Sequence, residues 1–425
     1  MNDTFVPFQT RKYLAIAKEP VFVGTGGYRI GRVDNTIIRD AGTGIPKIPG
    51  STISGNARYY SWLYYKSAGM NLNLGCAKGK KTEDEDACGV CPVCLTYGYI
   101  NDNGAHSGLA YFSDARILFF PVSTMIGTVW ITSDAIIKEF IEAGGDGTKL
   151  ENLEDEKFIT SHTLNSALPE TSRQKVLNFG WIMLEYKDEV NPQLWRLKKI
   201  EDNEEIADLA KILQKIDYRI CVVSQKVFYH IVNSNLETRT SVSINPVTGA
   251  AESGALFTYE ALPRGTVFIM DITYENPKNY NLDEPIENVI YTVEKGLSLF
   301  SSLGIGGMGT RGFGKIEVET DKWLDEHKYW ERVKDFLGNL PQKISELEVE
   351  IENSKISEED KKQSVELKNH LCKKLRLWNK YLTALSKLSE EEIEKKKGIF
   401  DLIKDIPTDI PETCSKSEEG NNDSN

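Results

Sequence analysis

Residues 33–58 read VDNTIIRDAGTGIPKIPGSTISGNAR, and this is the most informative stretch of the chain. It begins with a polar loop that contains Asp34 and ends in a segment with helical character. Ser51 and Thr52 follow a Pro-Gly pair, and both are residue types that cap helices. The free N–H groups of such a helix start can hold a phosphate, and Lys47 and Arg58 could reach the same group. The stretch therefore predicts a phosphate-binding helix start that follows an acidic loop.

Asp34 has two interpretations when its spacing is considered alone. A loop aspartate followed by Asn35 commonly begins an Asx turn, in which its carboxylate binds local backbone. A loop carboxylate can also take part in metal-assisted chemistry. Two further aspartates, Asp40 and Asp114, are possible helpers, although each is expected to bind local backbone.

Short strands and helices surround this stretch up to about residue 325. Strand character is found at 12–17, 21–24, 109–122, 219–223, 265–274 and 314–320, and 227–233 is expected to be helical. This mixture predicts an α+β fold with an antiparallel sheet.

The composition changes after residue 325, where Lys and Glu become frequent. Capping boxes at Ser357 and Ser389 help to predict helices at about 343–353, 358–386 and 390–404. Trp330, Trp378 and several leucines are expected to form a core-facing stripe. We therefore predict a helical extension over 326–412 and a disordered tail over 413–425.

Four of the seven cysteines lie in one short stretch with the spacing C-x11-C-x2-C-x2-C; they are Cys76, Cys88, Cys91 and Cys94. Thiolates at such short intervals can converge on one tetrahedral ion. We predict a structural Zn²⁺ site within an insertion at 70–105, with His106 as a spare ligand. An iron–sulfur cluster and a redox-active C-x-x-C pair are the alternatives.

The charge balance restricts where nucleic acid could bind. The formal net charge is −12, so the summed field repels a phosphate backbone, and any RNA site must be a local basic strip. No apolar run approaches the length of a membrane span. We expect a cytoplasmic protein without a membrane partner.

A glycine-rich loop near the end of the first part is a second candidate phosphate site. Six glycines fall within the eleven residues from Gly304 to Gly314. A dinucleotide fingerprint needs a strand before it and a helix after it, whereas here a helix-like segment precedes the loop and a strand follows. The backbone at Gly306 and Gly307 could approach an RNA phosphate, with charge from Arg311 and Lys315. A plain tight loop explains the glycines equally well.

The motifs, taken in order, resemble the RAMP superfamily of CRISPR effector complexes. They are EPVFVGTG at 19–26, the stretch quoted above, and GTRGFGK at 309–315. FSDARILFFPV at 112–122 and GALFTYEALP at 254–263 narrow the resemblance to the backbone subunits of type III-B (Cmr) complexes. The resemblance covers roughly residues 14–319. This chain departs from common family patterns at Ser54, where relatives often have lysine, and at Phe22, where they often have histidine.

The resemblance implies a ferredoxin-like (RRM-like) core over 1–325 and a β-hairpin thumb over 237–262 with its tip near Pro246. Copies of the chain would stack on a CRISPR guide RNA beside other Cmr-type subunits, and the thumb would interrupt the duplex with a complementary target RNA. Asp34 would then be catalytic, cutting the target with Mg²⁺ or Mn²⁺. The expected RNA contacts are Arg39, Lys47, Ser51, Thr52, Arg58, Arg239, Pro246, Gly306, Gly307, Arg311 and Lys315.

Three other functions stay open from the sequence. The chain could be an architectural RAMP subunit that binds guide RNA and cuts nothing. It could be a metal-free guide-processing nuclease, although none of its five histidines lies in a motif that suggests this. It could also be a zinc-stabilised α+β protein with no RNA role.

Overall fold

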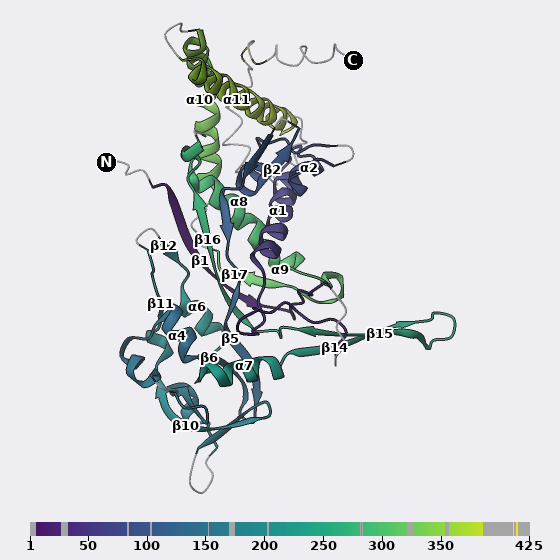
Figure 1. Cartoon of the computed structure of the whole chain (residues 1–425), viewed down its shortest axis with the longest axis vertical. Coiled ribbons are helices and arrows are strands. Elements are labelled where there is room, and N and C mark those ends of the chain that lie inside the picture. Colours follow the sequence, from purple (N-terminus) through teal and green to yellow (C-terminus); the bar gives the residue numbers. More distant parts are fainter. Residues whose placement is uncertain are drawn as a thin grey trace.

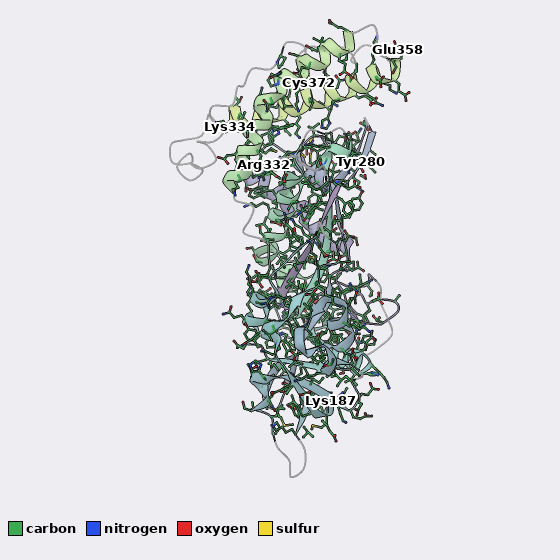
Figure 2. The ribbon with its side chains drawn as sticks, turned by 90° about the vertical axis from the view of Figure 1, so that its left-hand side faces the viewer. Lys187, Tyr280, Arg332, Lys334, Glu358 and Cys372 are labelled. Carbon is green, nitrogen blue, oxygen red and sulfur yellow. A yellow bond between two sulfur atoms is a disulfide. The ribbon has the colours of Figure 1, made fainter. Side chains whose placement is uncertain are left out.

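The computed structural model describes residues 6–26, 33–82, 85–102, 104–151, 153–169, 175–201, 204–280, 282, 284–320, 326–352, 357–385, 411 and 414. The molecule is elongated, with a pair of helices at one end and a lobe of short strands at the other (Figure 1). In the view turned by 90°, Arg332 and Cys372 mark the helical end and Lys187 marks the opposite lobe (Figure 2). None of the described helices combines the length and the apolar character that crossing a membrane requires.

An 11-stranded sheet runs through the described part of the chain in the order β12-β1-β16-β5-β6-β13-β8-β10-β9, with β17 on β1 and β4 on β16. The strands are β1 (Phe8–Ala17), β4 (Ala110–Phe112), β5 (Arg116–Thr124), β6 (Gly127–Ser133), β8 (Lys157–Ser161), β9 (Val176–Phe179), β10 (Ile182–Val190), β12 (Glu204–Ile206), β13 (Ile220–Val223), β16 (Val267–Glu275) and β17 (Ile316–Val318). The central strands β1, β16, β5 and β6 are antiparallel, as predicted. The pairs β1–β12, β6–β13 and β8–β10 are parallel, so the sheet as a whole is mixed.

Both faces of the central strands are buried, because successive side chains of a strand point to opposite faces. In β1, Tyr13, Ala15 and Ala17 enter one core, whereas Leu14 and Ile16 enter the other. Residues of α1 and α8 complete the first core, and residues of α4 and α6 complete the second. These helices are α1 (Gly50–Ser67), α8 (Ile286–Ser298), α4 (Asp134–Phe140) and α6 (Leu209–Lys215).

The smaller elements lie between the strands of the sheet in sequence. They are α2 (Leu74–Lys78), α3 (Pro92–Tyr97), α5 (His162–Asn165), α7 (Gln225–Ser234), α9 (Phe300–Leu303), β2 (Gly98–Asn101), β3 (Gly104–Ser107), β7 (Ile141–Glu142) and β11 (Arg196–Leu197). The helix predicted at 227–233 is α7. The glycine-rich loop follows α9 and precedes β17, which confirms that it is not a dinucleotide fingerprint.

A long two-stranded hairpin projects from the body of the molecule (Figure 1). It consists of β14 (Glu237–Ile244) and β15 (Ala251–Ala261), paired in register from Glu237 opposite Ala261 to Val242 opposite Leu256. Its base lies against the segments that hold Asp34 and the glycine-rich loop. The hairpin therefore connects an exposed tip to both candidate sites.

Two long helices, α10 (Glu326–Glu352) and α11 (Glu358–Leu385), pack against each other at one end of the molecule. The helix predicted at 358–386 is confirmed as α11, whereas α10 begins well before the predicted position 343. The predicted stripe is also confirmed, since Trp330 and Trp378 lie in one apolar core. The helix predicted at 390–404 lies outside the described residues, as does the predicted tail apart from Cys414. Cys414 forms a disulfide with Cys372, a pairing that was not predicted from the sequence.

The strand predicted at 21–24 is wrong. This segment forms two isolated β-bridges and no continuous strand. The bridges run from Val21 to Leu262 and from Gly24 to Ile37, because the segment lies between the hairpin base and the glycine-rich loop. The segment predicted as one strand at 109–122 is divided into β4 and β5. At the break, the Ser113 N–H binds the Asp271 carbonyl at 3.0 Å and the Ala115 N–H binds the Ile48 carbonyl at 2.8 Å.

Candidate nucleic-acid interface and metal centre

Asp34 lies at the base of the β14–β15 hairpin. Its Oδ2 accepts a hydrogen bond from the Thr258 backbone N–H at 2.8 Å. The Asn35 N–H donates to the Thr258 carbonyl at 3.0 Å, and the Glu260 N–H donates to the Asn35 carbonyl at 3.0 Å. The loop thus runs along β15 as a short parallel bridge, and the Asx turn that was one of the two interpretations of Asp34 does not form among the described residues. Within that part of the chain, Asp34 is half-buried and its Oδ1 has no hydrogen-bond partner.

Arg39 braces the loop that carries Asp34. Its Nη2 binds Glu260 Oε1 at 2.6 Å, its Nη1 binds the Ile37 carbonyl at 3.0 Å, and its Nε binds Asn233 Oδ1 at 3.1 Å. Glu260 Oε2 in turn accepts from the Ile37 N–H at 3.3 Å. Because the guanidinium is engaged on three sides, a phosphate would have to displace these partners. An RNA contact by Arg39 stays a prediction. The hydrogen bonds give Arg39 a structural role, because they join the loop to Glu260 and Asn233.

The start of α1 is built differently from the expectation. The N-cap residue is Pro49, whose side chain has no acceptor, so Ser51 and Thr52 lie in the first turn and are not caps. The acceptor comes from elsewhere, because Asp114 Oδ1 takes the Gly50 N–H at 2.9 Å. A Cβ at Gly50 would lie 2.3 Å from the Phe112 carbonyl oxygen, which explains why the helix starts on glycine.

Lys47 lies beside this helix start and is already paired. Its Nζ is 2.6 Å from Asp114 Oδ2 and 3.5 Å from Asp40 Oδ2. The hydrogen bond to Asp114 raises the pKa of Lys47, so the amine stays charged. Asp40 binds local backbone as expected, accepting from the Gly42 and Thr43 N–H groups at 3.0 and 2.9 Å. Asp114 instead binds residues far away in the sequence, which corrects the local role expected for it.

The glycine-rich loop folds onto the segment that contains Phe22. The Gly307 N–H donates to the Phe22 carbonyl at 2.9 Å, so it is not open to a phosphate as expected. Gly306 has φ +80°, and a Cβ there would lie 2.3 Å from the Phe22 carbonyl oxygen. The Phe22 ring packs edge-on against Tyr259 of β15, with ring centroids 5.7 Å apart. The loop is therefore held close to the hairpin base and to Asp34.

The positively charged side chains around the glycine-rich loop differ in whether they already have a partner. Arg311 is exposed, and its guanidinium has no partner among the described residues. Lys315 forms an ion pair with Glu19 at 3.1 Å. Arg239 of β14 lies 4.8 Å from the centroid of the Phe313 ring and pairs with Glu237 at 2.5 Å, so it ties the hairpin to the loop.

The hairpin tip exposes apolar side chains next to Pro246. Asn245 Oδ1 accepts from the Val247 and Thr248 N–H groups at 2.9 and 3.2 Å, which shapes the turn. Val247 is 91% exposed and Ile244 is 61% exposed, although both are apolar. Only Pro246 was expected at this tip. Thr258, Glu260 and Phe313 were also not predicted as site residues, although all three stand in the motifs at 254–263 and 309–315.

Arg58 holds the cysteine segment to α1. Its Nε and Nη2 bind the Cys76 carbonyl at 3.0 and 2.8 Å, and its Nη1 binds the carbonyls of Tyr97 and Gly98 at 3.2 and 2.7 Å. These four bonds leave little donor capacity for the phosphate contact that the sequence suggested. We expect Arg58 to stabilise the fold.

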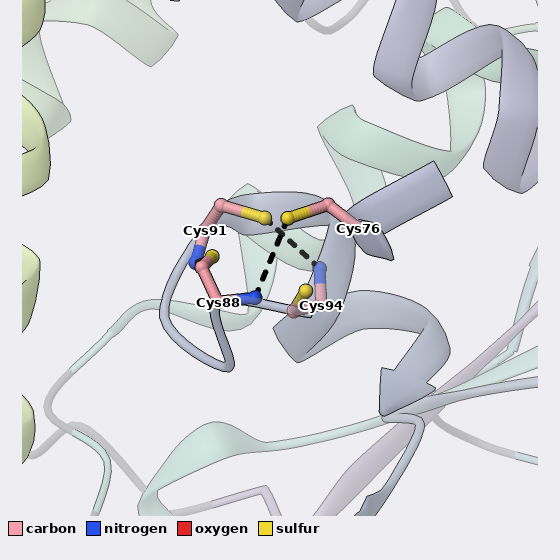
Figure 3. A group of neighbouring side chains, drawn as sticks. All are labelled: Cys76, Cys88, Cys91 and Cys94. Carbon is pink, nitrogen blue, oxygen red and sulfur yellow. Dashed lines mark hydrogen bonds between the residues drawn. The ribbon is translucent and has the colours of Figure 1, made fainter. Parts of the chain in front are cut away.

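The four clustered cysteines converge as predicted. The Sγ atoms of Cys76, Cys88, Cys91 and Cys94 all lie within 4.8 Å of one another, and three of the four residues are buried (Figure 3). Backbone N–H groups of Cys88, Cys91 and Cys94 point at sulfur atoms of the set at 3.3 to 3.5 Å. This donor set suits a tetrahedral thiolate-bound ion. His106 is outside the set and stacks on Tyr99 instead.

Comparison with known proteins agrees with this architecture. A model of the RAMP superfamily matches residues 16–317. The CRISPR system Cmr endoribonuclease Cmr4 of Pyrococcus furiosus is 27% identical over 296 residues, which cover 69% of this chain and 89% of that protein.

Two solved structures of Cmr proteins also match part of the chain. The apo state of the type III-B Cmr-beta complex contains a chain with TM-score 0.46 and 16% identity, covering 75% of this chain and 99% of that one. The oligomeric Cmr4 of Pyrococcus furiosus has TM-score 0.41 and 17% identity, covering 74% and 99%. Since the family model spans most of the mixed α/β part, this chain belongs to the RAMP superfamily.

Proposed function

We propose that this chain is the guide-RNA-binding backbone subunit of a type III-B CRISPR effector complex and that it cuts the paired target RNA. The similarity to a protein named as a Cmr endoribonuclease supports this function. The position of Asp34 carries the proposal, because its carboxylate is fixed at the base of a projecting hairpin with Oδ1 left without a partner among the described residues.

The β14–β15 hairpin is suited to the role of a thumb that enters the guide–target duplex. Apolar side chains that insert between bases unstack them and bend the strand. Val247, Ile244 and Leu256 are all more than half exposed on this hairpin. We assign the tip at Pro246 and Val247 to this insertion, within a ferredoxin-like core.

The guide backbone would run over the glycine-rich loop and the start of α1. Arg311 supplies the least engaged charge. Lys315 lies on the same loop, and Arg239 of β14 packs against it through the Phe313 ring. Ser51, Thr52 and Lys47 border the start of α1. With a net charge of −12, binding depends on this local strip and should weaken steeply with salt.

Asp34 supports cleavage by an internal nucleophile. The 2′-oxygen attacks the adjacent phosphorus to form a 2′,3′-cyclic phosphate, and Asp34 Oδ1 accepts the proton of the 2′-hydroxyl. The bond from phosphorus to the 5′-oxygen breaks, and the leaving oxygen takes a proton from water to become a 5′-hydroxyl. The Thr258 N–H binds Oδ2 and leaves Oδ1 without a partner among the described residues, where it could face the substrate. Holding the reacting groups in line supplies much of the rate.

A divalent ion fits this site only with a single ligand from the protein. Among the described residues, the four cysteines are the one group of three or more potential metal ligands that lie close together. Asp34 is therefore not part of a set of protein side chains that could bind a metal by themselves. Mg²⁺ commonly keeps several waters and binds one or two carboxylates together with substrate phosphate. Mg²⁺ or Mn²⁺ would neutralise charge on the reacting phosphate.

We assign structural Zn²⁺ to Cys76, Cys88, Cys91 and Cys94, in an insertion of the core. Four thiolates leave no open position for a substrate, so the site stabilises the fold and takes no part in cleavage. Further copies of the chain and other Cmr-type subunits are the proposed protein partners. The cytoplasmic location stays a prediction.

Metal dependence tests the cleavage proposal. The guide-loaded wild-type chain is expected to cut a complementary labelled RNA in Mg²⁺ or Mn²⁺ and to stop in EDTA, with activity restored by excess metal. The reaction is followed on a denaturing gel. Cutting that persists in EDTA would favour a metal-free nuclease, and the absence of cutting in every metal would favour the architectural subunit.

A further inference from the structure

The four cysteines share one apolar core with the C-terminal helices. Cys76, Cys91 and Cys94 lie in a core cluster that also contains Trp330 of α10 and Trp378 of α11, all buried. Two other apolar clusters fill the two faces of the sheet, and neither contains any of these residues. The helical pair therefore shares its core with the cysteine segment, which we define as residues 70–105, and with the adjacent parts of α1 and α8.

α11 is bonded to the loop that leads into the first cysteine. The Tyr381 hydroxyl donates to the Ala68 carbonyl at 3.1 Å. Further along this loop, Trp62 Nε1 donates to the Asn73 carbonyl at 2.9 Å, and Asn73 Oδ1 accepts from the Cys76 N–H at 3.0 Å. Hydrogen bonds from α11 and from α1 thus hold the two ends of the loop that leads to Cys76.

α10 is anchored on α1 and α8 through aromatic side chains. Tyr329 stacks on Tyr291 of α8 with ring centroids 3.8 Å apart. The hydroxyls of Tyr329 and Tyr65 are 2.9 Å apart, and Tyr65 belongs to α1. Trp330 of α10 stacks on Tyr381 of α11 at 5.9 Å, so the two helices and the loop at Ala68 form one packed unit.

The cysteine segment is built from short elements, which Arg58 ties to α1 by hydrogen bonds. α2 has 5 residues and α3 has 6, and the adjacent β2–β3 ribbon has strands of 4 residues each. Segments this short do not bury enough apolar surface to order themselves. In such modules the free energy of metal binding becomes folding free energy.

We infer that metal binding at the four cysteines holds α10 and α11 on the core, so that removing the metal releases the helical pair while the sheet stays folded. The inference rests on the proposed zinc site and is independent of the proposed RNA cleavage. It gives the helical extension a metal-dependent position on the effector subunit.

The test is hydrogen–deuterium exchange of the full chain, measured with zinc bound and after chelation. Zinc content is determined first, and one ion per chain is expected. After chelation, exchange in peptides from Glu326–Glu352 and Glu358–Leu385 should rise at least about tenfold, because local opening costs less free energy. Peptides from β5, β6 and β13 should keep their protection, and returning Zn²⁺ should restore protection in both helices.

Two variants sharpen the result. Cys221→Ser is the matched control, because Cys221 lies in the sheet core, where burial raises the pKa of its thiol to about 12. It should bind one zinc and keep both helices protected. Tyr381→Phe removes the hydroxyl bond to Ala68 and should raise exchange in α11 at unchanged zinc content.

The possible outcomes distinguish failure of the proposed zinc site from failure of the inference about α10 and α11. A chain that holds no zinc as purified and takes up none would overturn the zinc site itself. A chain that holds zinc but keeps α10 and α11 fully protected after chelation would overturn the inference alone. Loss of protection throughout the sheet on chelation would also contradict it, because the metal would then support the whole fold.

Discussion

Replacing Asp34 with asparagine is expected to reduce the rate of target-RNA cleavage by about 10²–10⁴-fold, the range typical of a lost proton-transfer group. Asparagine keeps an oxygen that can accept the Thr258 N–H, so the loop should stay in place along β15. It lacks the negative charge and the basicity that cleavage requires. Guide-RNA binding should be unchanged, because Asp34 is not expected to contact the guide.

Asp40→Asn is the matched control for this experiment. Asp40 lies on the same loop, but it binds the Gly42 and Thr43 N–H groups and shapes a turn. Single-turnover cleavage of a labelled target by guide-loaded wild type, Asp34→Asn and Asp40→Asn should show near-wild-type rates for Asp40→Asn. Wild-type cutting by Asp34→Asn would assign the activity elsewhere and leave this chain as an architectural subunit.

Arg58 and Arg311 are expected to respond in opposite ways to replacement by methionine. Arg58→Met leaves three partly buried carbonyl groups without their donor, and it should lower the free energy of unfolding by about 3 kcal/mol. Arg311→Met removes an exposed side chain without a partner in the described part of the chain, and stability should change by no more than about 0.5 kcal/mol.

For RNA affinity we expect the opposite order, with the larger effect from Arg311→Met. Arg311→Met should weaken guide binding about 5- to 10-fold and reduce its salt dependence by about one ion contact. The folded fraction of Arg58→Met should bind RNA as wild type does. Urea denaturation and fluorescence anisotropy measure the two effects. A large loss of affinity in folded Arg58→Met would restore the phosphate contact suggested by the sequence.

Of the central strands, β1, β5 and β16 could be predicted from sequence because their residues are apolar on both faces, whereas β6 was not predicted. β1, β5, β13 and β16 carry continuous buried runs that end at glycine or polar positions. The lobe with β8, β9 and β10 was not predicted. β10 reads IMLEYKDEV, in which charged residues interrupt the apolar pattern, and its pairing with β8 is parallel and not local.

The candidate site was only partly predictable, because its contacts join residues far apart in the chain. The motif around Asp34 could be recognised, but its partner Thr258 is 224 positions away. For Arg58, the sequence suggested a role that its contacts in the structure do not favour. Its spacing from Ser51 suggested a phosphate ligand, whereas helix geometry turns it toward the carbonyls of α2 and α3. The cysteine set was predictable because three of its ligands are local in sequence.

The RNA that co-purifies with the wild-type chain tests the central claim most directly. If the chain is a guide-binding backbone subunit, sequencing of RNA from the complex isolated at low salt should return short RNAs that share one repeat-derived 5′ end. A monomeric chain that carries no RNA, or carries unrelated fragments of cellular transcripts, would contradict it.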